Sequence, residues 1–227
     1  MTAFDLIIFD LDGTLYDTAP DVHDCVNLAL NQMDLPPVSL QQTMQAIGPG
    51  PGMFSKIILG EANVHRYDEY IQLFRPLYHQ KCLDKTRPFQ GIVELLNSLQ
   101  DYYKAVATNK PTTGTTIILK GSGLFEYFNL VIGPDCVEHA KPAPDMVYHA
   151  AAKLNVPLEK TLLIGDTDND ILAANAAGCY SCLAGWGYSA EKNKLQKISD
   201  FYAAHPLDIL NILTNSPLPV KKCVAVG

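Results

Sequence analysis

The chain has 227 residues, of which 48% are hydrophobic, and its formal net charge is −7. This length suits one large domain or a core with a smaller insertion. The sequence has no dense run of Lys or Arg and no apolar run of the ~18–20 residues that a membrane span requires, so we expect no nucleic-acid and no membrane partner. Scattered cysteines fit reduced thiols, and no secretory signal precedes the first apolar run, so we expect a soluble cytoplasmic protein.

Five short apolar runs predict β-strands. They are nearly continuous in hydrophobic character rather than alternating, which is typical of strands that are buried on both faces. Helical patterns separate the later runs. This alternation predicts an α/β fold, with a Rossmann-like parallel sheet as its core and helices on both faces. The predicted strands are 4–10, 104–108, 129–133, 161–165 and 179–184, and the predicted helices are 89–101, 112–121, 143–154 and 169–177.

The segment between the first strand and the helix at 89 contains helical patterns and no convincing strand. Thr18 and Asp21 have the spacing of a capping box, which predicts that a helix begins there. Further helices are predicted near 39–47, 53–60 and 65–82.

An insert of this length is too long for a loop, so we predict two domains. Residues 1–16 and 86–227 would form an α/β core domain, and residues 17–85 would form a small all-helical cap domain. We expect the cap over the carboxyl ends of the strands, where open α/β sheets bind ligands. The tail from residue 215 on is expected to be irregular.

Polar residues that can carry chemistry follow the carboxyl ends of four predicted strands. Because the ends of parallel strands meet at one edge of a sheet, these side chains should converge. Carboxylates are costly to bring together away from water unless positive charge lies between them. The residues are Asp10 and Asp12 in FDLDGT, Thr108 in ATNKP, Lys141 in HAKPAPD, and Asp166 and Asp170 in IGDTDND.

Four motifs together resemble the haloacid dehalogenase superfamily of phosphatases. They are DLDGT, TNK, KPAP and GDTDNDILAANAAG, and they occur in order on the expected strand ends. The longer opening FDLDGTLYDTAPD most resembles the phosphoglycolate phosphatase branch, and the helical insert resembles the cap of that superfamily. The resemblance spans nearly the whole chain.

The resemblance implies a role for each of these residues. Asp10 would attack phosphorus and form an aspartyl-phosphate. Asp12 would protonate the leaving alkoxide and later deprotonate the hydrolytic water. The hydroxyl of Thr108 and the amide of Asn109 would bind the phosphoryl group, and Lys141 would neutralise charge on that group and on Asp10.

The implied cofactor is Mg²⁺. Asp10, Asp166 and Asp170 form a carboxylate set that suits a hard divalent cation, with waters and a phosphate oxygen completing an octahedron. The resemblance adds the backbone carbonyl of Asp12 as a ligand and makes Asp170 the member that acts through water. Asp168 is expected instead to cap the helix that follows.

The predicted function is Mg²⁺-dependent hydrolysis of a small phosphate monoester, with phosphoglycolate as the first candidate. A nucleotide, sugar-phosphate or pyrophosphate phosphatase and a phosphoglucomutase would use the same chemistry, and a non-catalytic phosphate-binding or regulatory protein is the alternative from another class. Dehalogenation is disfavoured, since that branch has no acid at the position of Asp12. The expected partner is a small phosphorylated metabolite, and the expected state is a monomer or homodimer.

Some of these residues also have ordinary structural interpretations. Taken alone, Thr108 could cap the helix that follows it, and Lys141 could be a surface lysine. Lys110 is expected to be solvated, with phosphate contact as the weaker alternative.

Other features concern the surroundings of the site. GPGPG at 48–52 is interpreted as a turn of the cap that faces the substrate, and AGWGY at 184–188 as a structural loop beside the pocket. His139 is expected to be the only histidine near the site. Basic residues of the cap include candidates for binding a substrate carboxylate or second phosphate, and the sequence does not choose among them: Lys56, Arg66, Arg75, His79, Lys81, Lys85 and Arg87.

Overall fold

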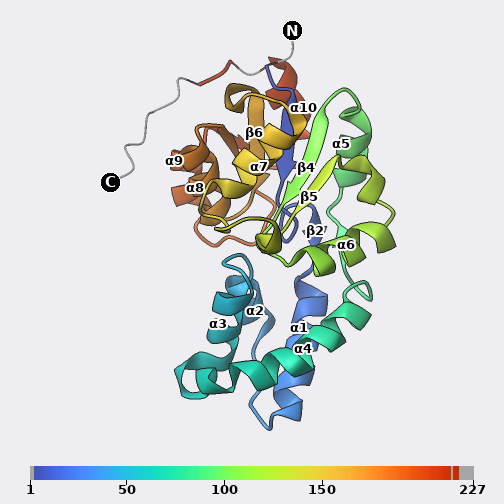
Figure 1. The fold of residues 1–227 in the computed structure, drawn as a ribbon, viewed down its shortest axis with the longest axis vertical. Helices are drawn as coiled ribbons and strands as arrows, with labels where there is room; N and C mark the ends of the chain where they lie inside the picture. The colour runs from blue at the N-terminus through green and yellow to red at the C-terminus, as the bar shows by residue number, and fades with distance from the viewer. Residues whose placement is uncertain (1–2, 216, 220–227) are drawn as a thin grey trace.

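The core of the protein is a parallel sheet of six strands in the order β5-β4-β1-β6-β7-β8 (Figure 1). The structure is a computed structural model that describes residues 3–215 and 217–219. All five predicted strands are present, so the predicted α/β class is confirmed. The strands of this sheet are β1 (Leu6–Phe9), β4 (Tyr103–Ala107), β5 (Leu130–Ile132), β6 (Thr161–Gly165), β7 (Tyr180–Ala184) and β8 (Phe201–Ala203).

Each face of the sheet has its own hydrophobic core, because successive side chains of a strand point to opposite faces. Ile7 and Phe9 pack with residues of α5, α6 and α10, whereas Leu6 and Ile8 pack with residues of α7 and α8. Among the described residues, no helix is both long enough and apolar enough to span a membrane. The core helices are α5 (Ile92–Ser98), α6 (Thr112–Gly121), α7 (Asp145–Leu154), α8 (Asp168–Ala177), α9 (Lys192–Ile198) and α10 (Asp208–Asn215), with short 3-10 turns η2 (Phe125–Tyr127), η3 (Pro134–Cys136) and η4 (Leu158–Lys160).

The last part of the core, β8 with α9 and α10, was not predicted. β8 has three residues and only Ala203 is fully buried, so it leaves no apolar run that a pattern search would find. In α10 the buried residues are Ile209, Ile212 and Leu213. Asn215, predicted to be irregular, is the last residue of that helix, and most of the predicted tail lies outside the described residues.

Four α-helices of the insert form a separate layer beyond the sheet, in the lower half of Figure 1. α1 packs along α4, and the rings of Tyr70, Phe74 and Tyr78 stack along α4 with centroids 5.5 Å apart. Buried residues of α1, including Val22, Val26 and Leu30, belong to the same core cluster as Tyr70. The helices are α1 (Ala19–Gln32), α2 (Leu40–Ala46), α3 (Pro51–Asn63) and α4 (Tyr67–Lys81), with the 3-10 turn η1 (Val64–Arg66) before α4.

Two linkers join this helical layer to the core, and they pair with each other. β2 (Tyr16–Asp17) and β3 (Arg87–Pro88) form an antiparallel two-stranded ribbon. The chain therefore enters and leaves the helical layer at one place. On this ground we propose the domain division that the sequence predicts, with the core at 1–16 and 86–227 and the cap at 17–85.

The predicted capping box at the start of α1 is wrong. Thr18 precedes the helix, but its hydroxyl donates to Asp12 Oδ1 at 2.6 Å. The Asp21 carboxylate accepts from the backbone N–H groups of Lys85 and Thr86 at 2.7–3.0 Å. Both side chains thus bind partners outside their own helix, and Asp21 ties the first turn of the cap to the returning linker.

Candidate active site

The chain turns sharply after β1 and brings two carboxylates to the edge of the sheet. Asp10 continues the strand, since its N–H donates to Ile164 O at 2.9 Å. Gly13 has φ +80°, which favours glycine, and a Cβ at this position would collide with the carboxylate of Asp166. The turn therefore places Asp12 back over the site and lets Asp166 approach the backbone.

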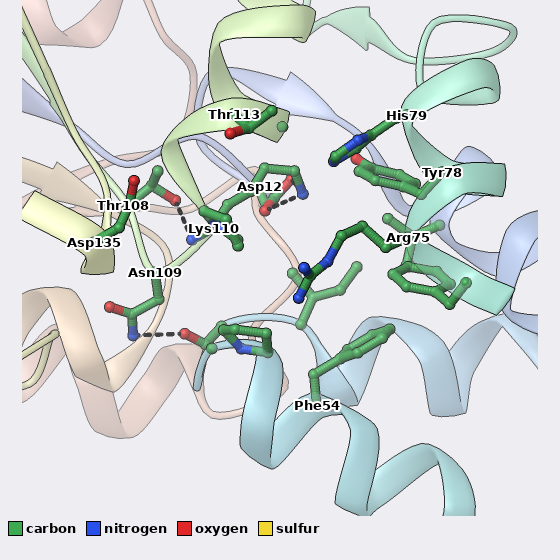
Figure 2. A pocket seen from close by; sticks show the side chains of 18 of the residues that line it. Asp12, Phe54, Arg75, Tyr78, His79, Thr108, Asn109, Lys110, Thr113 and Asp135 are labelled. Carbon is green, nitrogen blue, oxygen red and sulfur yellow. Dashed lines mark hydrogen bonds and ion pairs between the residues drawn. The ribbon is translucent and has the colours of Figure 1, made fainter. Parts of the chain in front are cut away.

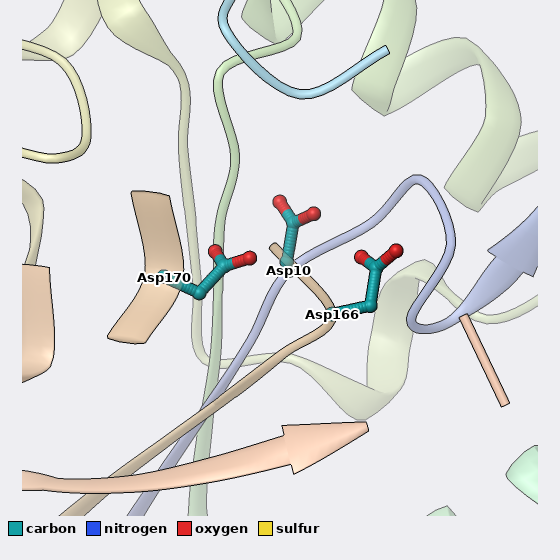
Figure 3. Close-up of side chains that lie close together, drawn as sticks. All are labelled: Asp10, Asp166 and Asp170. Atoms are coloured by element: carbon teal, nitrogen blue, oxygen red, sulfur yellow. The ribbon is translucent and has the colours of Figure 1, made fainter. Parts of the chain in front are cut away.

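Three buried carboxylates from distant segments lie together at this edge (Figure 3). Asp10 follows β1, Asp166 follows β6, and Asp170 lies in the first turn of α8. One oxygen of each lies within 4.8 Å of the others. The predicted convergence of these side chains is observed.

Lys141 reaches the same cluster from the loop before α7. Its Nζ donates to Asp10 Oδ1 at 2.8 Å, to Asp170 Oδ1 at 2.5 Å and to Ala107 O at 2.7 Å. Burial lowers the pKa of Lys141, but the two carboxylates outweigh it and hold that pKa above its ordinary value. Lys141 is therefore a charged, buried residue of the site and not the surface lysine of the structural alternative.

The net charge of the three carboxylates and Lys141 suits a divalent cation. When all three carboxyls are ionised, they and the one ammonium leave two negative charges in a buried cluster. Burial raises the pKa of Asp10 to about 6, although Lys141 opposes the rise. Burial, followed by the charges of Asp10 and Asp170, raises the pKa of Asp166 well above its ordinary value. The residues present thus fit a hard dication, which prefers such oxygen ligands.

Asp166 is oriented by hydrogen bonds to both oxygens of its carboxylate. Thr14 Oγ1 donates to Oδ1 at 3.2 Å, and the N–H of Tyr188 donates to Oδ2 at 2.7 Å. A Cβ at Gly187 would collide with the Asp166 side chain. The Tyr188 hydroxyl also donates to Asp17 Oδ1 at 2.7 Å. The AGWGY loop, interpreted from sequence as structural, therefore connects the acidic cluster to the first linker.

The helix that carries Asp170 is capped differently from the prediction. Thr167, not Asp168, precedes α8, and Asp170 Oδ2 accepts from the N–H and hydroxyl of Thr167 at 3.1 and 2.8 Å. Asp168 is exposed. Asp170 thus contacts both Lys141 and the helix N-terminus, which fixes its rotamer.

Asp12 lies on the pocket side of the turn and is bound by a different lysine. Lys110 Nζ donates to both Asp12 oxygens at 3.0 and 2.9 Å, and it lies 4.8 Å from the ring centroid of Tyr78 in the cap. The prediction that Lys110 is solvated is wrong, because its side chain is buried by α4. The sequence gives no local signal for the burial of Lys110, because this burial depends on the position of the cap.

Thr108 and Asn109 follow β4 and connect the core to the cap loop. The Thr108 hydroxyl accepts from the Lys110 N–H at 3.3 Å, and the helix that follows is preceded by Pro111, so Thr108 does not cap it. The Asn109 side-chain NH₂ donates to Gly48 O and to Lys141 O, both at 2.9 Å. Within the described residues the backbone N–H of Asn109 has no hydrogen-bond partner, so it is free for a ligand.

A cavity of about 310 Å³ lies between these residues and the cap (Figure 2). Asp10, Asp12 and Thr108 line its core side, and Gly48 and Gly50 of the GPGPG turn line its cap side. The expectation that His139 is the only histidine near the site is wrong. His139 is exposed beside Asp145, whereas the cavity is lined by His79, which α4 places one turn after Arg75.

Comparison with known proteins is consistent with this geometry. The model of the family described as "Haloacid dehalogenase-like hydrolase" matches residues 7–184. A phosphoglycolate phosphatase from Caulobacter vibrioides is 32% identical, covering 94% of each chain, and one from Aquifex aeolicus is 32% identical, covering 92% of this chain and 97% of its own. A crystal structure titled as a predicted phosphoglycolate phosphatase from Haemophilus somnus has a TM-score of 0.86 at 31% identity, covering 93% of this chain and 99% of its own. The chain therefore belongs to the haloacid dehalogenase-like hydrolase family.

Proposed function

We propose that the protein is a Mg²⁺-dependent phosphatase that hydrolyses a small phosphate monoester through an aspartyl-phosphate on Asp10. The observation that carries the proposal is the position of Asp10, which lines the cavity while Lys141, Asp166 and Asp170 surround it from the core side. Phosphoglycolate is the first candidate substrate, because relatives that match nearly the whole chain bear the name phosphoglycolate phosphatase. A cavity of about 310 Å³ is consistent with a small ester.

In the proposed first step Asp10 acts as the nucleophile. Lys141 contacts Oδ1, and no described residue donates a hydrogen bond to Oδ2, so Oδ2 is available for attack. A bond forms from Oδ2 to phosphorus as the bond from phosphorus to the ester oxygen breaks. Asp12 gives its proton to the departing alkoxide.

In the second step water attacks the phosphorus of the aspartyl-phosphate. Asp12 takes a proton from that water, the bond from phosphorus to Asp10 breaks, and inorganic phosphate leaves. The Thr108 hydroxyl and the free backbone N–H of Asn109 would hold the phosphoryl oxygens through both steps.

Asp10, Asp166, Asp170 and the backbone carbonyl of Asp12 would hold the cation, with Asp170 acting through water. A bound Mg²⁺ would offset negative charge on the phosphoryl group in the transition state. Lys141 adds a second positive charge beside Asp10. Together, the cation and Lys141 would make the electrostatic potential at the phosphoryl group positive, although the residues of the site are mostly acidic.

The test is phosphate release from phosphoglycolate, AMP, a hexose phosphate and pyrophosphate, with Mg²⁺ and with EDTA. We expect Mg²⁺-dependent release that is abolished in Asp10→Asn. Asp168→Asn is the matched control and should keep full activity, because Asp168 is exposed at the start of α8, two residues after Asp166. Full activity of Asp10→Asn, or no release from any ester by the folded wild-type protein with Mg²⁺, would contradict the proposal.

A further inference from the structure

The end of the cavity that the cap forms is both apolar and basic. Phe54, Ile71 and Phe74 supply apolar surface, and Arg75 and His79 supply basic groups. Among the described residues that the cap contributes to the lining, none is acidic. If the proposed function holds, an ester whose phosphate reaches Asp10 places its alcohol part against this wall.

The structure shows which of the seven basic residues named from the sequence line the cavity. Lys56 lies outside the lining of the cavity. Four others lie outside it too and have partners of their own: Arg66 binds Glu69 at 2.8 Å, Lys81 binds Asp84 at 3.5 Å, Lys85 binds Asp24 at 2.5 Å, and Arg87 donates to backbone carbonyls at 2.7–3.1 Å. Arg75 and His79 are the two that line the cavity.

Among the described residues that line the cavity, Arg75 and Lys110 are the two cations, and only Lys110 has an ion-pair partner. Both oxygens of Asp12 bind Lys110. Figure 2 shows the Arg75 side chain extending from α4 into the cavity. Across residues 3–215 and 217–219, no hydrogen bond or ion pair is made by its guanidinium, so its donors are free.

His79 complements Arg75 as a neutral group. Burial lowers the pKa of His79, and the charges of Arg75 and Lys110 lower it further. Near neutral pH it is therefore an uncharged imidazole, which can donate one hydrogen bond. The positive charge at this end of the cavity belongs to Arg75.

We propose that Arg75 binds a second anionic group, a carboxylate or a phosphate, on the alcohol part of the substrate. A guanidinium suits this role because its planar donors match two oxygens of such a group at once. The inference rests on the proposed phosphatase function and narrows its substrates to small phosphate esters that carry an anion at their other end. Phosphoglycolate is one member of this class.

The test compares three esters that differ at that end. Phosphoglycolate carries a carboxylate, ethylene glycol bisphosphate carries a second phosphate, and ethyl phosphate carries no second charge. kcat/KM is measured for the wild-type protein, Arg75→Met and Arg75→Lys. Lys81→Met is the matched control, because it removes one positive charge from the same helix outside the cavity. The melting temperature of each variant shows that it is folded.

We expect Arg75→Met to lower kcat/KM by about ten- to a hundredfold for an ester with a second anion, the usual worth of a hydrogen bond to a charged group. Arg75→Lys should lose less, and ethyl phosphate should be hydrolysed by all variants at nearly the wild-type rate. A loss confined to phosphoglycolate assigns the carboxylate, and a loss confined to the bisphosphate assigns the phosphate.

Two results would overturn the inference while leaving the phosphatase function intact. An equal loss for ethyl phosphate would mean that Arg75 acts on the cap or on the transferred phosphate, and no loss for any ester would mean that it does not contact substrate. A wild-type protein that hydrolyses none of the three esters, or whose hydrolysis survives Asp10→Asn, would instead show that the proposed function itself is wrong.

Discussion

Asp12 is held by groups from two different parts of the molecule. Lys110 of the core contacts both of its oxygens, and the Thr18 hydroxyl, at the start of the cap, donates to Oδ1. A general acid must lie at a defined distance from the leaving oxygen to be effective. The two contacts therefore orient the carboxylate that we propose as acid and base.

Removing Lys110 should impair turnover because it releases Asp12 from this position. We expect Lys110→Met to lower kcat by about 10²-fold, the cost of a small misplacement of a catalytic group. Steady-state kinetics on the preferred ester measure it. Lys120→Met is the control and should be unaffected, because Lys120 lies near the end of α6, the helix that follows Lys110, over the Phe125 ring. A Lys110 variant with wild-type kcat would show that Asp12 needs no such support.

The acidic cluster makes stability depend on pH and on a cation together. The pKa of Asp10 is raised from 3.8 to about 6, and that of Asp166 is raised as well. In the absence of a cation both carboxyls bind protons more tightly in the folded chain than in the unfolded one. The contribution of Asp10 to the free energy of unfolding should therefore fall as the pH rises from 3.8 through about 6, and that of Asp166 should fall in the same direction.

At pH values where the carboxyls are ionised, a bound cation should offset the loss of unfolding free energy that their burial causes. We expect Mg²⁺ to raise the melting temperature more near pH 7.5 than near pH 5, since protons compete for the same oxygens at the lower pH. Thermal unfolding with Mg²⁺ and with EDTA at both pH values measures it. Asp166→Asn should lose the Mg²⁺ effect and Asp168→Asn should keep it. Equal shifts at both pH values would argue against carboxylate ligands.

At the scale of elements, α1 is tied to the returning linker through one side chain. The buried Asp21 carboxylate accepts the backbone N–H groups of Lys85 and Thr86. Three residues on, Asp24 binds the Lys85 ammonium at 2.5 Å, but both of these side chains are about half exposed. The two aspartates thus offer a comparison between a buried tether and a surface ion pair on one helix.

We expect Asp21→Asn to lower the free energy of unfolding by about 1–3 kcal/mol, because a buried charged acceptor is lost from two amide donors. Asp24→Asn should cost less than about 1 kcal/mol, as exposed ion pairs usually do. Urea unfolding of the two variants beside the wild-type protein measures both. Equal losses would show that the amide contacts of Asp21 contribute no more than a surface pair.

How far the sequence predicted each element depended on whether the signal was local. The strands β1, β4, β6 and β7 are continuous apolar runs, and the polar residues after them could be placed at one sheet edge without a structure. β8 has three residues and one fully buried side chain, so it leaves no such run, whereas α10 has Ile209, Ile212 and Leu213 at helical spacing and was missed although its pattern is local. Thr18 and Asp21 had capping-box spacing, but their partners lie across the linker ribbon and in the turn after β1.

The same limit applies to the site. Asp10, Asp166, Asp170 and Lys141 converge because parallel strands bring their ends together. The contact of Lys110 with Tyr78 depends on the docking of the cap, which no local pattern encodes. Likewise, choosing Arg75 among the basic residues of the cap required the cavity.

At the scale of the whole molecule, the cavity lies at the boundary between the core and the cap, which contribute different residues to it. The core presents the acidic cluster, and the cap covers it with α3 and α4 (Figures 1 and 2). Contacts across the boundary include the hydrogen bond from Thr18 to Asp12, Lys110 over the Tyr78 ring, and the hydrogen bond from Asn109 to Gly48 O of the cap turn. The chain crosses between the layers only at the paired linkers β2 and β3 within its described part.

The most direct measurement is covalent trapping of the phosphoryl group on Asp10. Asp12→Asn is mixed with p-nitrophenyl phosphate and Mg²⁺, because this leaving group needs no proton and the second step lacks its base. We predict a burst of nitrophenolate equal to the enzyme concentration and, after acid quenching, a phosphorylated peptide that contains Asp10. Turnover without a burst, or a phosphoryl group on any other residue, would contradict the mechanism.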